Sequence, residues 1–168
     1  LSVLENGQVD LQSQSGLLSE LIDRAVASAG AGAKGLRIDR DRVAEDVRLQ
    51  TDCDRLVQVF INLISNAAKY CDADRPELTV RPRVAGADLV IDFVDNGSGL
   101  PSDEQAVIFE KFSRVGETGP GGAGLGLAIC REIMARLGGE IAYLPGQNGA
   151  AFRVVVPVGA QQGTRAAQ

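Results

Sequence analysis

The sequence predicts an α+β fold in which helices pack as a layer on a mixed β-sheet. Residues 54–70 and 125–137 carry apolar side chains at helical spacing, whereas several shorter segments have the character of strands. These helices and strands follow one another irregularly, which suggests a layered α+β sandwich. A length of 168 residues and a hydrophobic content of 45% fit one domain with a substantial core.

The first predicted elements are short. Residues 1–15 are polar and weakly patterned, and we expect a linker or the end of an upstream element there. An amphipathic helix follows and ends among the glycines of residues 30–35; its apolar residues are Leu17, Leu18, Leu21, Ile22, Ala25 and Val26. Residues 36–39 and 47–50 alternate as short strands would.

The central element is predicted as a helix over 54–70, a segment without Gly or Pro. Its apolar residues form one broad stripe that we expect to face the core: Leu56, Val59, Phe60, Leu63, Ile64 and Ala67. Asp52 or Cys53 is placed to begin this helix. Asp is the better N-cap, because its carboxylate can accept hydrogen bonds from free backbone N–H groups.

Two strands are predicted next, over 77–84 and 89–94, with a turn at 85–88 between them. Pro82 cannot donate a ladder hydrogen bond, so we expect the first of these strands at the edge of the sheet. In the second strand, Leu89, Ile91 and Phe93 share one side and are expected to face the core.

The last third of the chain is predicted as loop, helix and hairpin. Residues 99–122 are expected to be mostly loop with a helical turn over 103–109, and a helix over 125–137 ends at Gly138 and Gly139. We expect this helix to bury Leu125, Ala128, Ile129, Ile133 and Leu137. Residues 140–144 and 151–157 should pair around an Asn-Gly turn. The predicted domain therefore spans 16–158, followed by a frayed tail over 159–168.

Charge and cysteine content narrow the class of protein. The chain has 17 basic and 22 acidic residues and a net charge of −5, which argues against a nucleic acid or an anionic membrane as partner. No apolar run approaches the ~18 residues of a membrane span, and no signal peptide is found. The three cysteines lack metal-type spacing and indicate a reduced, cytosolic setting. Because the chain begins with Leu, we expect a fragment of a longer protein.

A polar stripe lies beside the apolar face of the 54–70 helix. Asn62, Asn66, Lys69 and Tyr70 share one side, and Asn66 and Tyr70 border the apolar face. Asn is unfavourable inside a helix because its amide competes for backbone hydrogen bonds. The stripe therefore indicates either the lining of a binding site or a solvated face with incidental amides.

Asp95 follows the 89–94 strand and precedes Gly97 and Gly99. A carboxylate at this place can accept a hydrogen bond from a ligand, for example from the exocyclic amine of adenine. The two glycines would let a flat ligand approach the backbone closely. The alternative is turn chemistry alone, since any strand-to-loop turn can use these residues.

A glycine-rich run from Gly119 to Gly126 leads into the helix that begins near Leu125. Backbone N–H groups at such a helix start attract anions, and the helix dipole adds to the attraction. The P-loop pattern is absent, because Leu125 stands where it requires Lys, and the run reads GxGxG where the dinucleotide motif requires GxGxxG. A flexible hinge is the alternative interpretation.

These three motifs and the sequence Phe109-Glu110-Lys111-Phe112 occur in an order that resembles one family. They look like the N, G1, F and G2 boxes of the ATP-binding catalytic domain of sensor histidine kinases, in the superfamily of gyrase-type ATPases and heat-shock chaperones. The resemblance covers about residues 17–158. It implies a two-layer α/β sandwich (the Bergerat-type ATP-binding fold) with a mixed sheet and about three helices. It also implies ATP and Mg²⁺ as cofactors.

The resemblance implies a role for each residue of the polar helix stripe. Asn66 would be the Mg²⁺ ligand that connects the metal to the ATP phosphates, and Asn62 would assist one turn earlier. Lys69 would contact the phosphates, and Tyr70 would pack against the adenine. Phosphoryl transfer depends on such positioning and charge neutralisation more than on covalent chemistry by the protein.

The resemblance also implies roles for the two glycine motifs and the segment between them. Asp95, with Gly97 and Gly99 beside it, would recognise the adenine. Phe109 and Phe112 would anchor a glycine-rich lid, and Arg114 would reach the γ-phosphate. The phosphates would be cradled by Gly122, Gly124, Leu125 and Gly126.

Some features depart from the family pattern. Ala123 stands where many members have Ser or Thr, the lid is short, and the chain contains no His. The phosphoacceptor His of the family belongs to a dimerisation hairpin, of which residues 1–15 would be the end. The expected partners are therefore that hairpin and a response regulator, with no nucleic acid and no membrane contact. We expect a monomeric, cytoplasmic fragment.

Two alternative functions remain from the residues. A related ATPase or protein-serine kinase would carry Glu four residues before the Mg²⁺ ligand, as general base. Here that position is Asn62, whose amide cannot take up a proton, which disfavours this alternative. The second alternative is a degenerate, non-catalytic module that binds ATP or only a partner.

Overall fold

A five-stranded sheet forms one layer of the computed structural model, which describes residues 11–30, 32–110 and 123–158. The strand order is β2-β4-β5-β7-β6. The strands are β2 (Arg37–Arg40), β4 (Glu77–Ala85), β5 (Asp88–Asp95), β6 (Glu140–Tyr143) and β7 (Ala151–Pro157). Strand β2 runs parallel to β4 and the other neighbouring pairs are antiparallel, so the sheet is mixed, as predicted.

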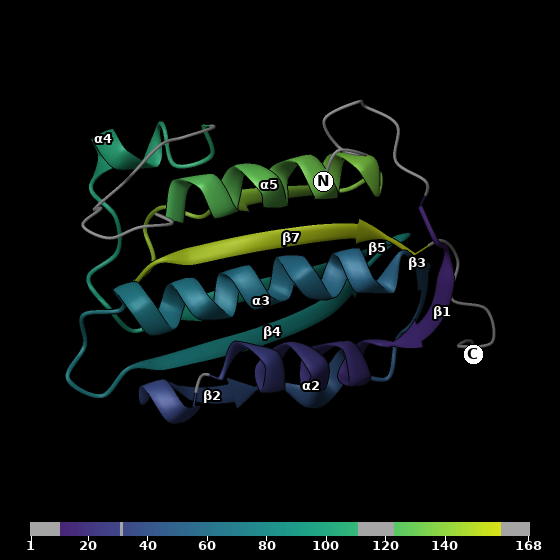
Figure 1. The fold of residues 1–168 in the computed structure, drawn as a ribbon, viewed down its shortest axis with the longest axis horizontal. Helices are drawn as coiled ribbons and strands as arrows, with labels where there is room; N and C mark the ends of the chain where they lie inside the picture. The colour runs from purple at the N-terminus through teal and green to yellow at the C-terminus, as the bar shows by residue number, and fades with distance from the viewer. Residues whose placement is uncertain (1–10, 31, 111–122, 159–168) are drawn as a thin grey trace.

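Three helices lie side by side across one face of this sheet (Figure 1). They are α2 (Leu18–Ala29), α3 (Cys53–Tyr70) and α5 (Ala123–Arg136), and α3 lies between the other two. Short pieces complete the described chain: η1 (Gly32–Lys34), η2 (Arg42–Ala44), α4 (Ser102–Gln105) and a ribbon of β1 (Gln14–Leu17) with β3 (Arg48–Thr51). The predicted two-layer α+β sandwich is confirmed.

Helix α3 is the centre of the core. Its predicted apolar stripe is buried throughout, and the Phe60 ring packs on Phe93 of β5 with 5.5 Å between ring centroids. Burial of each large apolar side chain of this kind stabilises the fold by about 1.5–3 kcal/mol. The helix begins as expected, because the carboxylate of Asp52 accepts a 3.2 Å hydrogen bond from the backbone N–H of Arg55.

Strand β1 corrects the predicted start of the domain. Gln14 and Ser15 lie within the predicted 1–15 linker, yet they pair with Thr51 and Gln50 of β3. Their side chains are exposed, so the local sequence carries no apolar alternation that would indicate a strand. The strand forms through backbone pairing with a distant segment, and the folded unit therefore includes Gln14.

Strand β4 is not at the edge of the sheet, contrary to the prediction from Pro82. It lies between β2 and β5. Strand β2 pairs only with Glu77–Val80, however, and Pro82 lies beyond this stretch, where β4 pairs with β5 alone among the described strands. The missing N–H of Pro82 is tolerated because β4 has a strand partner on only one side at this position.

Helix α5 buries Ile133 as predicted, but the rest of its buried face differs from the sequence pattern. Its fully buried side chains are Leu127, Cys130, Ile133 and Met134. The predicted Ala128, Ile129 and Leu137 are only half-buried, and the side chain of Leu125 is outside the described set. Apolar residues occur nearly all round this helix, so periodicity does not select one face, and packing against α3 decides.

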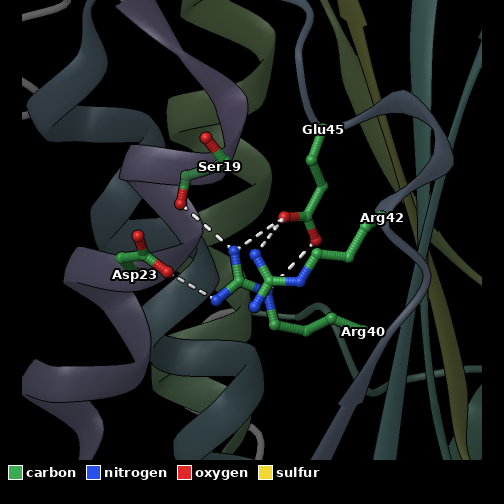
Figure 2. Close-up of polar contacts among 5 residues, drawn as sticks. All are labelled: Ser19, Asp23, Arg40, Arg42 and Glu45. Carbon is green, nitrogen blue, oxygen red and sulfur yellow. Dashed lines mark hydrogen bonds and ion pairs between the residues drawn. The ribbon is translucent and has the colours of Figure 1, made fainter.

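A polar cluster attaches α2 to the end of β2 (Figure 2). The Arg40 guanidinium donates to both carboxylate oxygens of Glu45, at 3.1 and 2.8 Å, and to the carbonyl oxygen of Ser19 at 3.2 Å. It also forms an ion pair with Asp23 of α2, and Arg42 reaches Glu45 at 3.4 Å. Glu45 is only 3% exposed, so this fork satisfies a buried charge and fixes α2 relative to the sheet.

Candidate functional site

A cavity of about 290 Å³ opens between the C-terminal half of α3, the loop that follows β5, and the start of β7. Its apolar walls include Leu63, Leu78, Phe93, Ile108, Leu127 and Phe152. Its polar side chains are few and come from separate segments: Asn66, Tyr70, Asp72, Asp95, Ser98 and Glu104. An apolar cavity with a few convergent polar groups is typical of a site for a small, flat ligand.

Asn66 lines this cavity, and one end of its amide is unsatisfied. Helix α3 carries Asn66 and Tyr70 one turn apart, and both line the cavity. The Asn66 Nδ2 atom is buried and has no hydrogen-bond partner among the described residues. An unpaired buried polar group costs about 1–3 kcal/mol, so this amide is better explained by a missing ligand than by a structural role.

The carboxylate of Asp95 is oriented by backbone groups at the end of β5. Its Oδ1 atom accepts hydrogen bonds from the N–H of Gly97, at 2.9 Å, and of Ala150, at 3.0 Å. No donor among the described residues contacts Oδ2, which leaves this oxygen for a donor in the cavity. Burial raises the pKa of Asp95, and the nearby charge of Asp72 adds to the rise, although the two backbone hydrogen bonds oppose it.

Gly149 is a site residue that the sequence analysis missed. A Cβ atom built on Gly149 would lie 2.7 Å from Oδ1 of Asp95 and closer still to the carbonyl oxygen of Asp95. Only Gly therefore allows the β6–β7 turn to approach Asp95. The Asn148-Gly149 pair predicts a turn, and no local signal indicates that this turn closes one wall of a cavity.

Asp72 is a second residue that the sequence analysis missed. Its Oδ1 accepts from the backbone N–H of Ser98, at 2.8 Å, and its Oδ2 from the Ser98 hydroxyl, at 2.6 Å. These two hydrogen bonds lower the pKa of Asp72. A Cβ on Gly97 would lie 2.8 Å from Asp72 Oδ1, so Gly97 is needed for this contact. Asp72 thereby ties the loop after β5 to the end of α3.

Some predicted residues lie beside the cavity and do not line it. The Asn62 amide points to α5, where its Nδ2 donates to the carbonyl oxygen of Gly126, at 3.4 Å, and to Cys130 Sγ, at 3.3 Å. Lys69 is exposed, with its Nζ 5.8 Å from the centroid of the Tyr70 ring. Phe109 is half-buried and meets Phe152 edge-on. Neither Asn62 nor Lys69 contacts the cavity surface in this conformation.

The glycine run and the lid are described only in part. Gly124, Leu125 and Gly126 belong to the first turn of α5. Phe112, Arg114 and Gly122 lie outside the described residues. The lid itself, expected over much of this segment, is therefore also outside the description.

The described part of the chain carries neither a metal-binding cluster nor a membrane-spanning helix. No group of three or more His, Cys, Asp or Glu side chains there could hold a metal ion. A metal in this cavity would thus rely on one or two protein ligands and on oxygens of its own ligand, which is the usual arrangement for Mg²⁺ with phosphates. None of the described helices is long and apolar enough to cross a membrane.

Comparisons with known proteins agree with this geometry. The family model described as histidine kinase-, DNA gyrase B-, and HSP90-like ATPase matches residues 51–160. The chain is 45% identical over 102 residues to the sensor protein KdpD of Escherichia coli (strain K12), and 40% identical over 116 residues to the sensor protein VanS of Enterococcus faecium. These matches cover 60% and 67% of the chain but only 11% and 30% of the relatives.

Solved structures show the same fold. The catalytic domain of the histidine kinase ThkA superposes with a TM-score of 0.76 at 25% identity, covering 88% of this chain and 97% of that one. The mycobacterial sensor histidine kinase MprB gives a TM-score of 0.72 at 23% identity, covering 89% and 100%. The likeness to MprB bears on the fold alone.

Proposed function

The chain belongs to the histidine kinase-, DNA gyrase B-, and HSP90-like ATPase family, and we propose that it is the ATP-binding catalytic domain of a sensor histidine kinase. In this proposal the cavity holds Mg²⁺·ATP, and the γ-phosphoryl group passes to a histidine on a separate dimerisation hairpin. One observation carries the proposal: Asp95, with an open carboxylate oxygen, and Asn66, with an unpaired amide nitrogen, line the same apolar cavity.

The Asp95 end of the cavity fits adenine. Adenine presents an exocyclic amine, which donates, whereas guanine presents a carbonyl oxygen at the same place, which would repel a carboxylate. Asp95 Oδ2 is open for this donor, and Gly97 and Gly99 line the cavity beside it. The apolar side chains of the cavity, Leu63 and Phe93 among them, would cover the faces of the base.

The Asn66 end fits the metal and phosphates. Asn66 would hold Mg²⁺ through its amide oxygen, and its Nδ2 would then be free to donate to a phosphate. Mg²⁺ would neutralise phosphate charge there. Gly124, Leu125 and Gly126 stand in the first turn of α5, whose backbone N–H groups are suited to an anion. We assign Lys69 and Arg114 to the phosphates as well, Lys69 from the exposed end of α3 beside the cavity.

The protein's contribution to the reaction is orientation and charge compensation. Asn62 carries an amide and cannot remove a proton from water, which favours transfer to a separate acceptor over hydrolysis. In this structure Asn62 binds α5, so we assign it to the alignment of the α5 N-terminus with α3. The acceptor imidazole can arrive neutral and needs no base from this domain.

The acceptor has to come from outside the chain, which contains no His. We therefore propose that a dimerisation hairpin carries the acceptor histidine. A response regulator would then receive the phosphoryl group from that histidine. The chain spans at most 30% of the two curated relatives described above, which leaves room for such parts. A cytoplasmic location also belongs to this proposal.

The experiment is transfer in trans. The chain is mixed with γ-labelled ATP, Mg²⁺ and the hairpin of the full-length protein, and the labelled product is treated with acid and with base. We expect label on the hairpin only, in a bond that acid cleaves and base does not. Without the hairpin no protein should be labelled. Label that survives acid would indicate a phosphoester on Ser or Thr and would overturn the histidine-kinase proposal.

A further inference from the structure

Tyr143 of β6 lies next to the nucleotide cavity without lining it. Its hydroxyl accepts a 3.1 Å hydrogen bond from the backbone N–H of Leu100, in the loop that follows Asp95. Strand β6 is the last strand of the sheet, so this contact joins the sheet edge to the cavity wall. Leu100 itself lines the cavity.

The Tyr143 ring is held by its neighbours, so the hydroxyl has a defined place. It pairs across the hairpin with Phe152 and meets that ring edge-on, with 5.3 Å between centroids. Phe152 in turn meets Phe109 edge-on at 6.1 Å. Phe152 is a cavity residue, and the aromatic group therefore connects the cavity wall with the phenol that supports the loop.

The loop of residues 95–100 is fixed at both ends. At one end, Asp95 accepts from Gly97 and Ala150. At the other, Leu100 donates to Tyr143 and accepts from the Gln105 side chain at 2.8 Å.

Between these ends, Gly99 has a left-handed φ of 84°. A Cβ on Gly99 would lie 3.5 Å from both the Tyr143 hydroxyl and the Gly149 carbonyl oxygen. The underside of the loop thus rests on Tyr143 and Gly149.

The geometry points to Tyr143 as a positioning residue for the base-binding half of the cavity, an inference that rests on the proposed function. The hydroxyl holds Leu100, and with it the cavity-lining Gly97 and Gly99, in a position that lets a base reach Asp95. Loss of the hydroxyl removes one of the two hydrogen bonds that hold Leu100, so this end of the loop is fixed less firmly while Asp95 keeps its own backbone donors. Nucleotide affinity is therefore lost through weaker binding of the base, while the phosphate contacts of α3 and α5 stay as they are.

The test compares Tyr143→Phe, which keeps the ring and its packing, with the wild-type chain. Calorimetry with AMP, ADP and Mg²⁺·ATP should show affinity weakened about three- to tenfold for all three nucleotides, the size of one lost neutral hydrogen bond. The ratio of ATP to ADP affinity and the dependence on Mg²⁺ should stay unchanged. The amide of Leu100 should exchange its hydrogen faster in the variant. With the hairpin supplied, KM for ATP should rise and kcat should not.

Thr79→Val is the matched control, since it also removes one hydroxyl. Thr79 lies on β4 between the buried Leu78 and Val80 and does not line the cavity. It should leave all nucleotide affinities unchanged. Equal nucleotide affinities for Tyr143→Phe and wild type would overturn the role of Tyr143 while the proposed function stands. The same holds if the loss of affinity is accounted for by a lower urea midpoint of unfolding in the variant. A wild-type chain that binds no adenine nucleotide would overturn both.

Discussion

The carboxylate of Asp95 and the backbone N–H of Ala150 are joined by a 3.0 Å hydrogen bond between the end of β5 and the start of β7. The Asp95 N–H donates in return to the Ala150 carbonyl oxygen at 2.9 Å. Two adjacent antiparallel strands thus hold the carboxylate at the cavity while the sheet ladder continues. The residue expected to select the base is thus joined to the neighbouring strand through both its backbone and its carboxylate.

Asp95→Asn should abolish the preference for ATP over GTP. The amide can place an NH₂ group where the carboxylate accepts, so the adenine amine loses its partner. We expect ATP affinity to fall by about 1.5–3 kcal/mol, the range for a hydrogen bond to a charged group. Calorimetry with both nucleotides measures this. Asp92→Asn, on the same strand but outside the cavity and paired with Arg153, is the control and should retain the preference. A wild-type chain that binds ATP and GTP equally would contradict the assignment.

The base preference should also depend on pH. The pKa of Asp95 is raised, chiefly by burial, so its contribution to stability is fully present below the unfolded pKa and is lost as pH rises through the folded pKa. Base selection has the opposite sign, because only the carboxylate accepts from adenine. The ATP-to-GTP affinity ratio should therefore fall as pH decreases from about 7 to about 5. Phosphate protonation affects both nucleotides alike and cancels in the ratio. In Asp95→Asn the ratio should be flat, and a parallel decline there would refute the explanation.

Asn66→Ala should remove the Mg²⁺-dependent part of ATP affinity and leave the Mg²⁺-independent part. Because the Nδ2 atom has no partner among the described residues, the substitution removes the cost of burying it, and we expect the free energy of unfolding to stay at or above that of wild type. Titrations of ATP with and without Mg²⁺, together with urea unfolding, separate the two effects. Ser65→Ala, the preceding helix position, serves as control. Persistent Mg²⁺ dependence in Asn66→Ala would rule out Asn66 as the ligand.

Gly149→Ala should weaken nucleotide binding by displacing Asp95. The added methyl group would clash with the backbone carbonyl oxygen of Asp95 and would lie 2.7 Å from its Oδ1, so the turn or the end of β5 must move, at a cost of about 1–3 kcal/mol. Gly146→Ala, in the same turn, is the control. It meets nothing within 4 Å but has a φ of 86°, so it adds backbone strain alone. ATP affinity should fall in Gly149→Ala and hold in Gly146→Ala, even if both lose some stability. The reverse order would exclude steric displacement of Asp95.

Glu45→Gln should destabilise the fold far more than Asp23→Asn, although both carboxylates contact Arg40. The Glu45 side chain is 3% exposed and the Asp23 side chain 62%. Removal of the buried partner leaves Arg40 with only the exposed Asp23 as counter-charge and should cost about 3–5 kcal/mol, whereas the exposed pair is worth at most about 1 kcal/mol. Urea denaturation of the two variants gives the comparison. Similar losses in both would show that the cluster acts as a surface feature.

Local signals in the sequence were enough to predict the helix and strand that build the core. The apolar stripe of α3, its Asp52 cap and the inward side of β5 each follow from spacing within one segment, and the structure confirms them. Asn66, Tyr70, Asp95, Gly97 and Gly99 reach one cavity because the first two belong to a predicted face of α3 and the others follow a predicted strand. Their roles toward ATP stay predictions.

What the sequence could not indicate depends on contacts between distant segments. Strand β1 exists through its pairing with β3, and the buried face of α5 is chosen by packing rather than by its own pattern. Gly149 and Asp72 support the loop after β5 from two other parts of the chain. Neither residue lies in a motif, so only the folded chain reveals their part in the cavity.

The overhang of β4 beyond β2 has a consequence for the behaviour of the protein at high concentration. Past Val80, this strand has β5 as its only strand partner among the described residues. Open strand edges invite pairing between molecules, which leads to aggregation. Here the stretch beyond β2, on a strand against which η2 also packs, carries the exposed residues Arg81 and Arg83 on either side of Pro82, which has no N–H to donate. A strand from another molecule would meet two positive charges and a gap in the hydrogen-bond ladder, and the sheet is thereby guarded against edge-to-edge association.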